Sequence, residues 1–123
     1  MRSVHIAQVC KQMHNLVQKQ DLDGFKALFS GKSKRNLHLI DVNTPNPRGE
    51  SILHQAVKTD NLDLVQACLN LGADPFQKSR KGKIPVELTK KESIKNLLKS
   101  VLLVSIKFFI LTLHIYFVII LKK

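Results

Sequence analysis

The residue types that could do chemistry are few in this sequence, and their spacing matches no common catalytic or metal-binding pattern. Two cysteines, Cys10 and Cys68, lie 58 positions apart, so they lack the short spacing of a zinc site or a disulfide framework. Residues 31–33 (Gly-Lys-Ser) are similar to the end of a phosphate-binding loop, but that loop needs a glycine where this chain has Lys26. The histidines show no His-Glu-x-x-His or comparable ligand spacing; they are His5, His14, His38, His54 and His114. We therefore expect a protein that is not an enzyme, with no metal, no cofactor and no small-molecule substrate.

Composition divides the chain into two unlike parts. Of the 123 residues, 44% are hydrophobic and 24% are charged, which suits one small folded domain. However, 17 of the 21 residues in 101–121 are apolar, so the first 100 residues are more polar than the average. The start of the chain carries polar residues every few positions and lacks the apolar core of a secretory signal. We expect the first 100 residues to lie in the cytoplasm, a reducing compartment that also suits two isolated cysteines.

The spacing of apolar residues predicts two short helices in the middle of the chain. Leu53, Ala56 and Val57 recur at i, i+3 and i+4, and a second apolar stripe covers residues 64–69. Gly72 comes directly after this second stripe, where a residue in the left-handed conformation commonly ends a helix. The sequence therefore predicts a helix, a turn and a second helix.

The same pattern begins again after one period, because Gly82 stands 33 positions after Gly49. The chain resembles the ankyrin repeat, a helix-turn-helix unit of this length. The residues that carry the resemblance are Gly49, Ser51, Leu53, His54, Ala56, Gly72, Ala73, Asp74, Pro75, Gly82 and Pro85. The resemblance implies an all-α fold, a short solenoid of stacked helix pairs. It also implies that His54 is structural and hydrogen-bonds near the turn with the hydroxyl of Ser51.

The period divides the chain into units. Residues 47–79 form one well-formed ankyrin repeat, and residues 80–100 form a truncated repeat whose first helix is about four residues short. Residues 1–46 form a degenerate helical repeat that aligns at an offset of 40, and the excess over one period is assigned to a loop inserted between Ser30 and Pro47. Three units are about the minimum for such an array, because each buries its apolar face only against a neighbour.

Ankyrin arrays bind other proteins through their turns and concave face, so the resemblance implies a protein partner whose identity the sequence does not give. The turns and first helices place eight residues where a partner could reach them. These candidates are Arg48, Glu50, Gln55, Lys58, Thr59 and, one period later, Lys81, Lys83 and Glu87. We expect these eight side chains to be exposed.

A narrower resemblance covers about 50 residues, from 47 to 100. Residues 69–76 (Leu-Asn-Leu-Gly-Ala-Asp-Pro-Phe) and 80–85 (Arg-Lys-Gly-Lys-Ile-Pro) are similar to the last ankyrin repeat of long fungal oxysterol-binding proteins. In that family the ankyrin region precedes a pleckstrin-homology domain and a lipid-transfer domain, and it helps to place the protein at membrane contact sites. Neither lipid-binding domain occurs in these 123 residues, so no sterol-binding residue can be carried over. The alternative hypothesis is therefore a truncated N-terminal fragment of such a lipid-transfer protein.

Residues 101–121 have the length and composition of one membrane-spanning helix. Sixteen Leu, Ile, Val and Phe residues contribute about −5 to −10 kcal/mol to insertion, whereas Lys107 costs at most ~3 kcal/mol. Four lysines before the segment and two after it favour a cytoplasmic N-terminal side, which would make this a single-pass, tail-anchored protein. Alternatively, the abrupt change of composition after Ser100 could come from translation of a non-coding or shifted reading frame.

Basic residues concentrate just before the apolar segment. Eight basic and two acidic residues between positions 76 and 99 give a net charge of +6. Nucleic acid is disfavoured as a partner, because Phe76 is the one aromatic residue in this stretch that could stack on a base. A nearby anionic membrane surface would contribute about 1 kcal/mol for each cation. The four lysines expected to lie against a membrane are Lys90, Lys91, Lys95 and Lys99.

Overall fold

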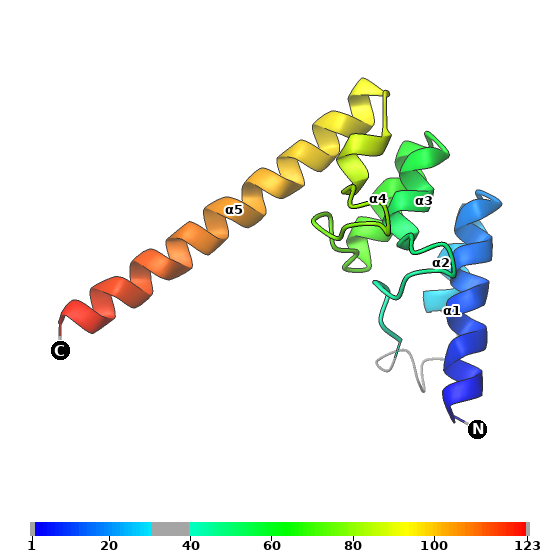
Figure 1. The fold of residues 1–123 in the computed structure, drawn as a ribbon, viewed down its shortest axis with the longest axis horizontal. Helices are drawn as coiled ribbons and strands as arrows, with labels where there is room; N and C mark the ends of the chain where they lie inside the picture. The colour runs from blue at the N-terminus through cyan, green and yellow to red at the C-terminus, as the bar shows by residue number, and fades with distance from the viewer. Residues whose placement is uncertain (1, 31–39, 123) are drawn as a thin grey trace.

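The computed structural model describes residues 2–30 and 40–122, and every regular element in these ranges is a helix. The elements are α1 (Arg2–Gln18), α2 (Leu22–Ser30), α3 (Ile52–Lys58), α4 (Leu62–Asn70), the 3-10 helix η2 (Pro85–Leu88) and α5 (Glu92–Leu121) (Figure 1). The inserted loop is described from residue 40 onward. The Gly-Lys-Ser segment at 31–33 and His38 lie outside the described residues.

The helices form three pairs that stack against one another. α1 pairs with α2, α3 pairs with α4, and η2 pairs with α5 (Figure 1). Between pairs, α1 packs on α3 and α3 packs on η2, which makes an inner row; α2 packs on α4 and α4 packs on α5, which makes an outer row. This is the all-α stack of helix-turn-helix units that the sequence predicts.

The hydrophobic core lies between the two rows. Leu53 and Val57 of α3 and Leu64 and Cys68 of α4 are fully buried, which confirms that the two predicted apolar stripes face each other. Each of the other pairs contributes to the same core. Its further members are Met13, Val17, Phe25, Ile52, Ala56, Val65, Ala67, Ala73, Ile94 and Leu98. One continuous core therefore joins all three pairs.

The first two helix pairs contain the same turn, 40 residues apart. Gln20 and Asp60 both have a positive φ, 57° and 58°. The next residue caps the following helix in each case: the side chain of Asp21 accepts the amide of Gly24 at 2.9 Å, and Asn61 caps α4 in the same way. Because an Asp or Asn oxygen satisfies an otherwise unpaired helix amide, both turns end one helix and begin the next.

Glycines permit the sharp loops that follow each unit. Gly72 has a φ of +94°, which confirms the left-handed helix ending expected from its position. Gly49 has a φ of +77° and also lies close to the next loop, since a Cβ on it would approach Cβ of Arg80 to 2.6 Å. Gly82 has a similar φ of +79°, but a Cβ there would meet nothing within 4 Å. Two glycines with one backbone shape thus differ in their surroundings.

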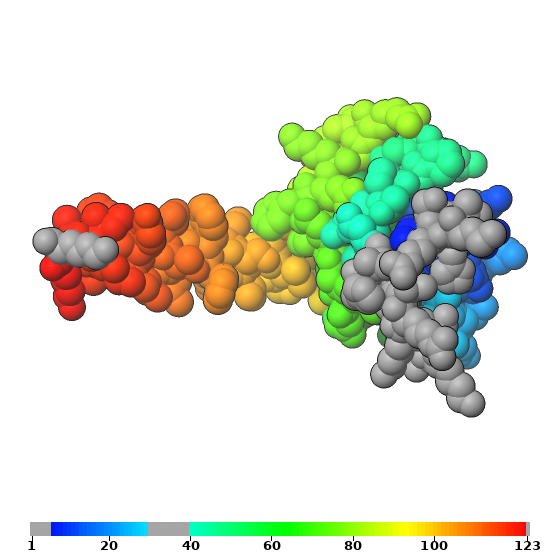
Figure 2. Space-filling model, turned by 90° about the horizontal axis from the view of Figure 1, so that it is seen from below, coloured from blue at the N-terminus to red at the C-terminus, as the bar shows by residue number. Residues whose placement is uncertain are grey.

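The boundary expected after residue 100 lies inside one helix, α5 (Glu92–Leu121). α5 runs through it without interruption over 30 residues, because the sequence there contains no glycine or proline that would end a helix. Ile94 and Leu98 are buried in the third pair, whereas large apolar side chains are exposed from Leu103 to Leu121. The second part of α5 therefore projects away from the stack as a bare rod (Figures 1 and 2).

The two glycines give a matched test of the stacked loops. Gly82→Ala should lower the free energy of unfolding by about 1 kcal/mol, the ordinary cost of a positive φ. Gly49→Ala should cost at least ~2 kcal/mol, because the new methyl group also displaces Arg80. The measurement is the urea dependence of thiol labelling at Cys68, in full-length Cys10→Ser protein in detergent micelles. Equal losses in the two variants would contradict the close contact of the loops.

Candidate protein-interaction surface

His54 is placed to hold the structure together. Its Nδ1 atom accepts the backbone amide of Ser51 at 3.2 Å and lies 2.6 Å from the Ser51 hydroxyl. Its Nε2 atom lies 2.7 Å from the carbonyl oxygen of Lys83, one unit later. Since a carbonyl can only accept, Nε2 carries a proton and Nδ1 is the acceptor for Ser51. The buried imidazole therefore caps α3 and ties it to the following loop, which is the structural role that the resemblance implies.

Hydrogen bonds also join the loop before α3 to the loop before η2. The amide of Arg80 donates to the carbonyl oxygen of Gly49 at 3.0 Å, and its guanidinium donates to the carbonyl of Pro47 at 3.0 Å. Further along, the side chain of Gln77 donates to the carbonyl of Asn43 at 2.7 Å. The partners are separated by 31 to 34 residues, about one repeat. The two loops therefore form a braced edge beside the inner row of helices.

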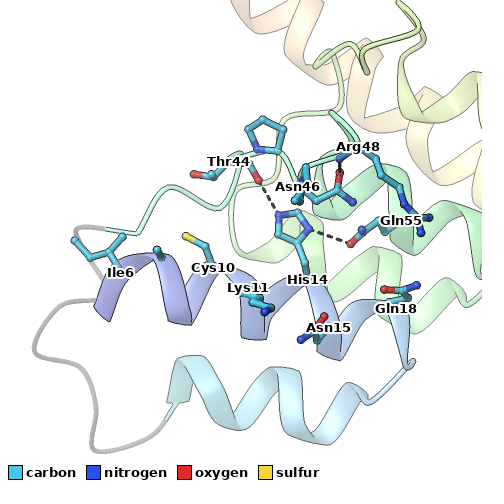
Figure 3. Close-up of a pocket in the computed structure, with 13 residues that line it drawn as sticks. Ile6, Cys10, Lys11, His14, Asn15, Gln18, Thr44, Asn46, Arg48 and Gln55 are labelled. Carbon is cyan, nitrogen blue, oxygen red and sulfur yellow. Dashed lines mark hydrogen bonds between the residues drawn. The ribbon is translucent and has the colours of Figure 1, made fainter. Parts of the chain in front are cut away.

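A groove of about 810 Å³ lies between α1 and the first of these loops (Figure 3). We call it the α1 groove. Its lining is mainly apolar carbon with a few polar groups, and it is built by Ile6, Ala7, Cys10, Lys11, His14, Asn15, Gln18, Thr44, Pro45, Asn46, Pro47, Arg48 and Gln55. Helix, loop and α3 all contribute, so the groove exists only once the first two units have stacked.

His14 forms the floor of the α1 groove. Its Nε2 atom lies 2.9 Å from the carbonyl oxygen of Thr44, and Nδ1 lies 3.0 Å from the Oε1 atom of Gln55 (Figure 3). With Nε2 protonated toward the carbonyl, Nδ1 of a neutral imidazole needs a donor, which Gln55 supplies when its side-chain amide is turned over so that the NH2 group faces the ring. His14 thus connects α1, the loop and α3, and it is 8% exposed. These bonds position the groove rather than leave the imidazole available for chemistry.

A second concavity of about 400 Å³ follows the first along the inner row. We call it the basic hollow. It is lined by Arg48, Glu50, Lys58, Ser79, Arg80, Lys81, Lys83 and Leu88. Arg48 also belongs to the α1 groove, so the two concavities adjoin at this side chain. Together they extend along the concave side of the stack, from α1 to η2.

Six of the eight side chains expected to meet a partner line these concavities. Arg48 and Gln55 line the α1 groove; Arg48, Glu50, Lys58, Lys81 and Lys83 line the basic hollow. Thr59 and Glu87 line neither concavity: the Thr59 hydroxyl donates to the carbonyl of Ala56 at 2.6 Å, and Glu87 accepts the amide of Ile84 at 2.8 Å. Both cap short helices.

The expectation that all eight are exposed is wrong for three of them. Gln55 and Thr59 are half-buried, and the Glu50 side chain is 13% exposed and pairs with Lys58. Each of the three makes a hydrogen bond or ion pair that draws its polar end onto the protein. Position in the repeat indicates which face a residue occupies, but not whether a neighbour covers it.

Sequence reasoning missed the contribution of α1. Ile6, Cys10, His14 and Gln18 follow one another at i+4 spacing and line one side of the groove. This spacing places residues on one face of a helix, so it was available in the sequence. This stripe is not recognised from hydrophobic periodicity, because Ile, Cys, His and Gln differ in polarity.

The four lysines expected near a membrane occupy the start of α5 and the residues just before it. Lys90 and Lys99 are exposed and Lys95 is half-buried, whereas Lys91 donates to the carbonyl of Asp60 at 3.0 Å. Beyond them, an 18-residue window of α5 reaches a mean hydropathy of 2.3 with none of it buried. Length and composition are thus those of one candidate membrane-spanning helix.

Comparison with known proteins agrees with this architecture. Residues 35–88 match the family model for ankyrin repeats. The crystal structures of the Osh1 ankyrin domain from Kluyveromyces lactis and Saccharomyces cerevisiae both superpose with a TM-score of 0.67, at 28% and 30% sequence identity. Each match covers 80% of this chain and 40% or 43% of the other. The stacked helix pairs therefore have an ankyrin-repeat fold.

The resemblance to the ankyrin region of fungal oxysterol-binding proteins is confirmed as well. Oxysterol-binding protein homolog 1 of Saccharomyces cerevisiae is 34% identical over 91 residues, which is 73% of this chain and 8% of that protein. The human ankyrin repeat domain-containing protein 29 is 44% identical over 52 residues, or 42% of this chain and 17% of the relative. The chain thus spans a small part of each curated relative. Ankyrin repeats generally act as interaction modules rather than as enzymes. The solved structures to which this chain is similar are ankyrin domains.

The two cysteines should differ sharply in reactivity. Cys10 is half-buried at the α1 groove, whereas burial raises the pKa of the Cys68 thiol from 9.0 to about 12. At pH 8 the Cys68 thiol is then almost entirely protonated, whereas the thiolate is the reactive form. We expect a maleimide to modify Cys10 in the folded protein and Cys68 only in denaturant, as mass spectrometry of the labelled peptides would record. Similar labelling rates at both sites would contradict the burial of Cys68.

Proposed function

We propose that this chain is a non-enzymatic ankyrin-repeat module that binds a partner protein along its concave side, and that α5 holds the module at a membrane. One observation carries the first part: the α1 groove and the basic hollow adjoin at Arg48 and extend along the inner row. A partner laid there would contact all three helix pairs. Most residues expected to meet a partner lie in this region.

The binding surface is built in advance of binding. His14 and His54 connect the inner helices to the loops, and Arg80 connects one loop to the next. Because these bonds fix the loops before a partner arrives, association has a small entropic cost of loop ordering. A braced concave face on repeated units suits recognition of an extended or helical segment of another protein.

The proposed units follow the repeat. Residues 1–46, 47–79 and 80–100 each supply one helix pair or part of one, and residues 101–121 supply the anchor. The turns at Gln20 and Asp60 support the assignment of the first two, because they have one geometry. The continuity of α5 means that the third unit and the anchor share a helix. The module would consequently be joined to the membrane without a flexible linker.

Photocrosslinking tests the concave side as the binding face. p-Benzoylphenylalanine placed at Lys11, in the α1 groove, or at Lys81, in the basic hollow, should yield the same partner adduct in extracts of cells that express the chain. The control is the same residue at Gln66, which is exposed on α4 in the outer row. Adducts that form from Gln66, and from neither inner position, would place the partner on the other face and refute the proposal.

Several features of α5 support membrane anchoring. The exposed part is about 30 Å long at 1.5 Å per residue, which matches the hydrocarbon thickness of a bilayer. The hydroxyls of Ser105 and Thr112 donate to the carbonyls of Val101 and Phe108, at 3.0 and 2.9 Å. Polar groups satisfied within the helix cost less in lipid than unpaired ones. Lysines at the start of α5 would lie near the headgroups.

Alkaline carbonate extraction of the full chain, synthesised with microsomes, tests the anchor. The wild-type chain should stay in the membrane pellet. A Phe109→Lys/Leu113→Lys variant should move to the soluble fraction, because two central lysines add up to ~6 kcal/mol to the ~3 kcal/mol of Lys107 and together offset the contribution of about −5 to −10 kcal/mol from the apolar residues. The matched control, Gln66→Lys/Asn70→Lys on the exposed face of α4, should behave as wild type. Release of the wild-type chain would refute the anchor.

A second candidate function rests on the similarity to Oxysterol-binding protein homolog 1, of which this chain matches 8%. In this alternative the chain is the ankyrin part of a longer lipid-transfer protein, and residues 101–123 come from a shifted or non-coding frame. Sequencing the mature transcript across the codons for Ser100 and Val101 separates the two. A transcript that continues from residue 100 into lipid-binding domains favours the fragment, and one that encodes residues 101–121 as given favours the anchor.

A further inference from the structure

The basic hollow has a strong imbalance of charge. Five cationic side chains line it, and its single acidic side chain, Glu50, is paired with Lys58. The cations are Arg48, Lys58, Arg80, Lys81 and Lys83. Like charges gathered in a concavity raise the local positive potential and attract anions at distances up to about the Debye length, ~8 Å at physiological salt.

Most of these cations have not been used to build the fold. Within the described part of the chain, Lys58–Glu50 is the one ion pair, and Arg80 is the one guanidinium that braces a loop. Lys81 and Lys83 are exposed, and their ammonium groups make no hydrogen bond among the described residues. The carbonyl of Lys83 serves His54, but its side chain does not. The hollow thus offers donors that folding does not require.

The surroundings of the hollow limit what could fill it. It is a recess between the loops and the inner helices, which a peptide can enter but the flat surface of a bilayer cannot follow. At Arg48 it adjoins the α1 groove, whose lining is mainly apolar and includes Ile6, Cys10 and Pro45. An occupant that fits both would be anionic in one part and apolar in the next.

We infer that the basic hollow binds a cluster of Asp and Glu residues in a partner protein, and that apolar residues next to that cluster lie in the α1 groove. This inference rests on the proposed concave binding face and adds the chemistry of the partner. Carboxylates would accept hydrogen bonds from Lys81, Lys83 and Arg48. Charge-assisted bonds of this kind are shorter and stronger than neutral ones.

Selection of random twelve-residue peptides by phage display, against the full chain in detergent micelles, tests the inference without knowledge of the partner. We expect the selected peptides to carry clustered Asp or Glu beside apolar residues. An Arg48→Glu/Lys81→Glu/Lys83→Glu variant should bind a selected synthetic peptide at least tenfold more weakly by fluorescence anisotropy, and raising the salt concentration should weaken wild-type binding.

A matched control separates this site from general attraction. Lys90→Glu/Lys95→Glu/Lys99→Glu carries the same change of charge on and beside α5, outside the hollow, and should bind the peptide within about twofold of wild type. Equal losses in both variants would overturn the inference, as would competition by phosphatidylserine vesicles that depends on Arg48, Lys81 and Lys83.

The outcomes also separate this inference from the proposed function. If the selected peptides are neutral or basic and crosslink to p-benzoylphenylalanine in place of Lys11, the inference of an acidic partner is wrong, but the proposed concave binding face still holds. If no selected peptide binds the concave side, both the inference and the proposed function are wrong. Correct folding of the charge-reversal variant is established by protection of Cys68 from maleimide, as in the wild type.

Discussion

The stacking of one helix pair on the next is the interaction on which the rest of this protein depends. Each pair is too thin to enclose its apolar side chains, so burial of Phe25, Leu53 and Ile94 requires three neighbouring units. His54 adds direction to this non-directional burial, because its ring joins the cap of α3 to the carbonyl of Lys83 in the next unit. With the spacing of units fixed in this way, the loops come into register and the two concavities form.

Hydrogen bonds between the loops of neighbouring units hold the concave surface in place. Arg80 closes against Gly49 and Pro47, and Gln77 closes against Asn43, each about one repeat away along the chain. The acceptors in these bonds are backbone carbonyl oxygens, and few polar side chains take part. Lys81 and Lys83 remain exposed beside the brace. The contacts between loops therefore rely mainly on backbone and neutral groups, with the Arg80 guanidinium as the exception, and Lys81 and Lys83 take no part in them.

Much of the fold could be predicted from particular residues. The i, i+3, i+4 spacing of Leu53, Ala56 and Val57 predicted α3, Gly72 predicted the end of α4, and the 33-residue return at Gly82 predicted a further unit. The helix α1 was harder, because its groove-lining stripe mixes polar and apolar residues. The face of the repeat that holds the candidate site could be predicted, but the burial of individual residues could not. Glu50 and Gln55 are half-buried, since Glu50 pairs with Lys58 and Gln55 contacts His14.

The sequence by itself determined the repeat, its turns, the excess of positive charge and an apolar segment long enough to cross a bilayer, because these depend on residue types and on spacing along the chain. Tertiary structure alone decided that Arg48 adjoins both concavities and that His14 reaches Gln55, 41 residues away along the chain. The physical reason is that local patterns select helices and turns, whereas a surface made by several units depends on how their helices pack, and many sequences share a pattern while differing in those contacts.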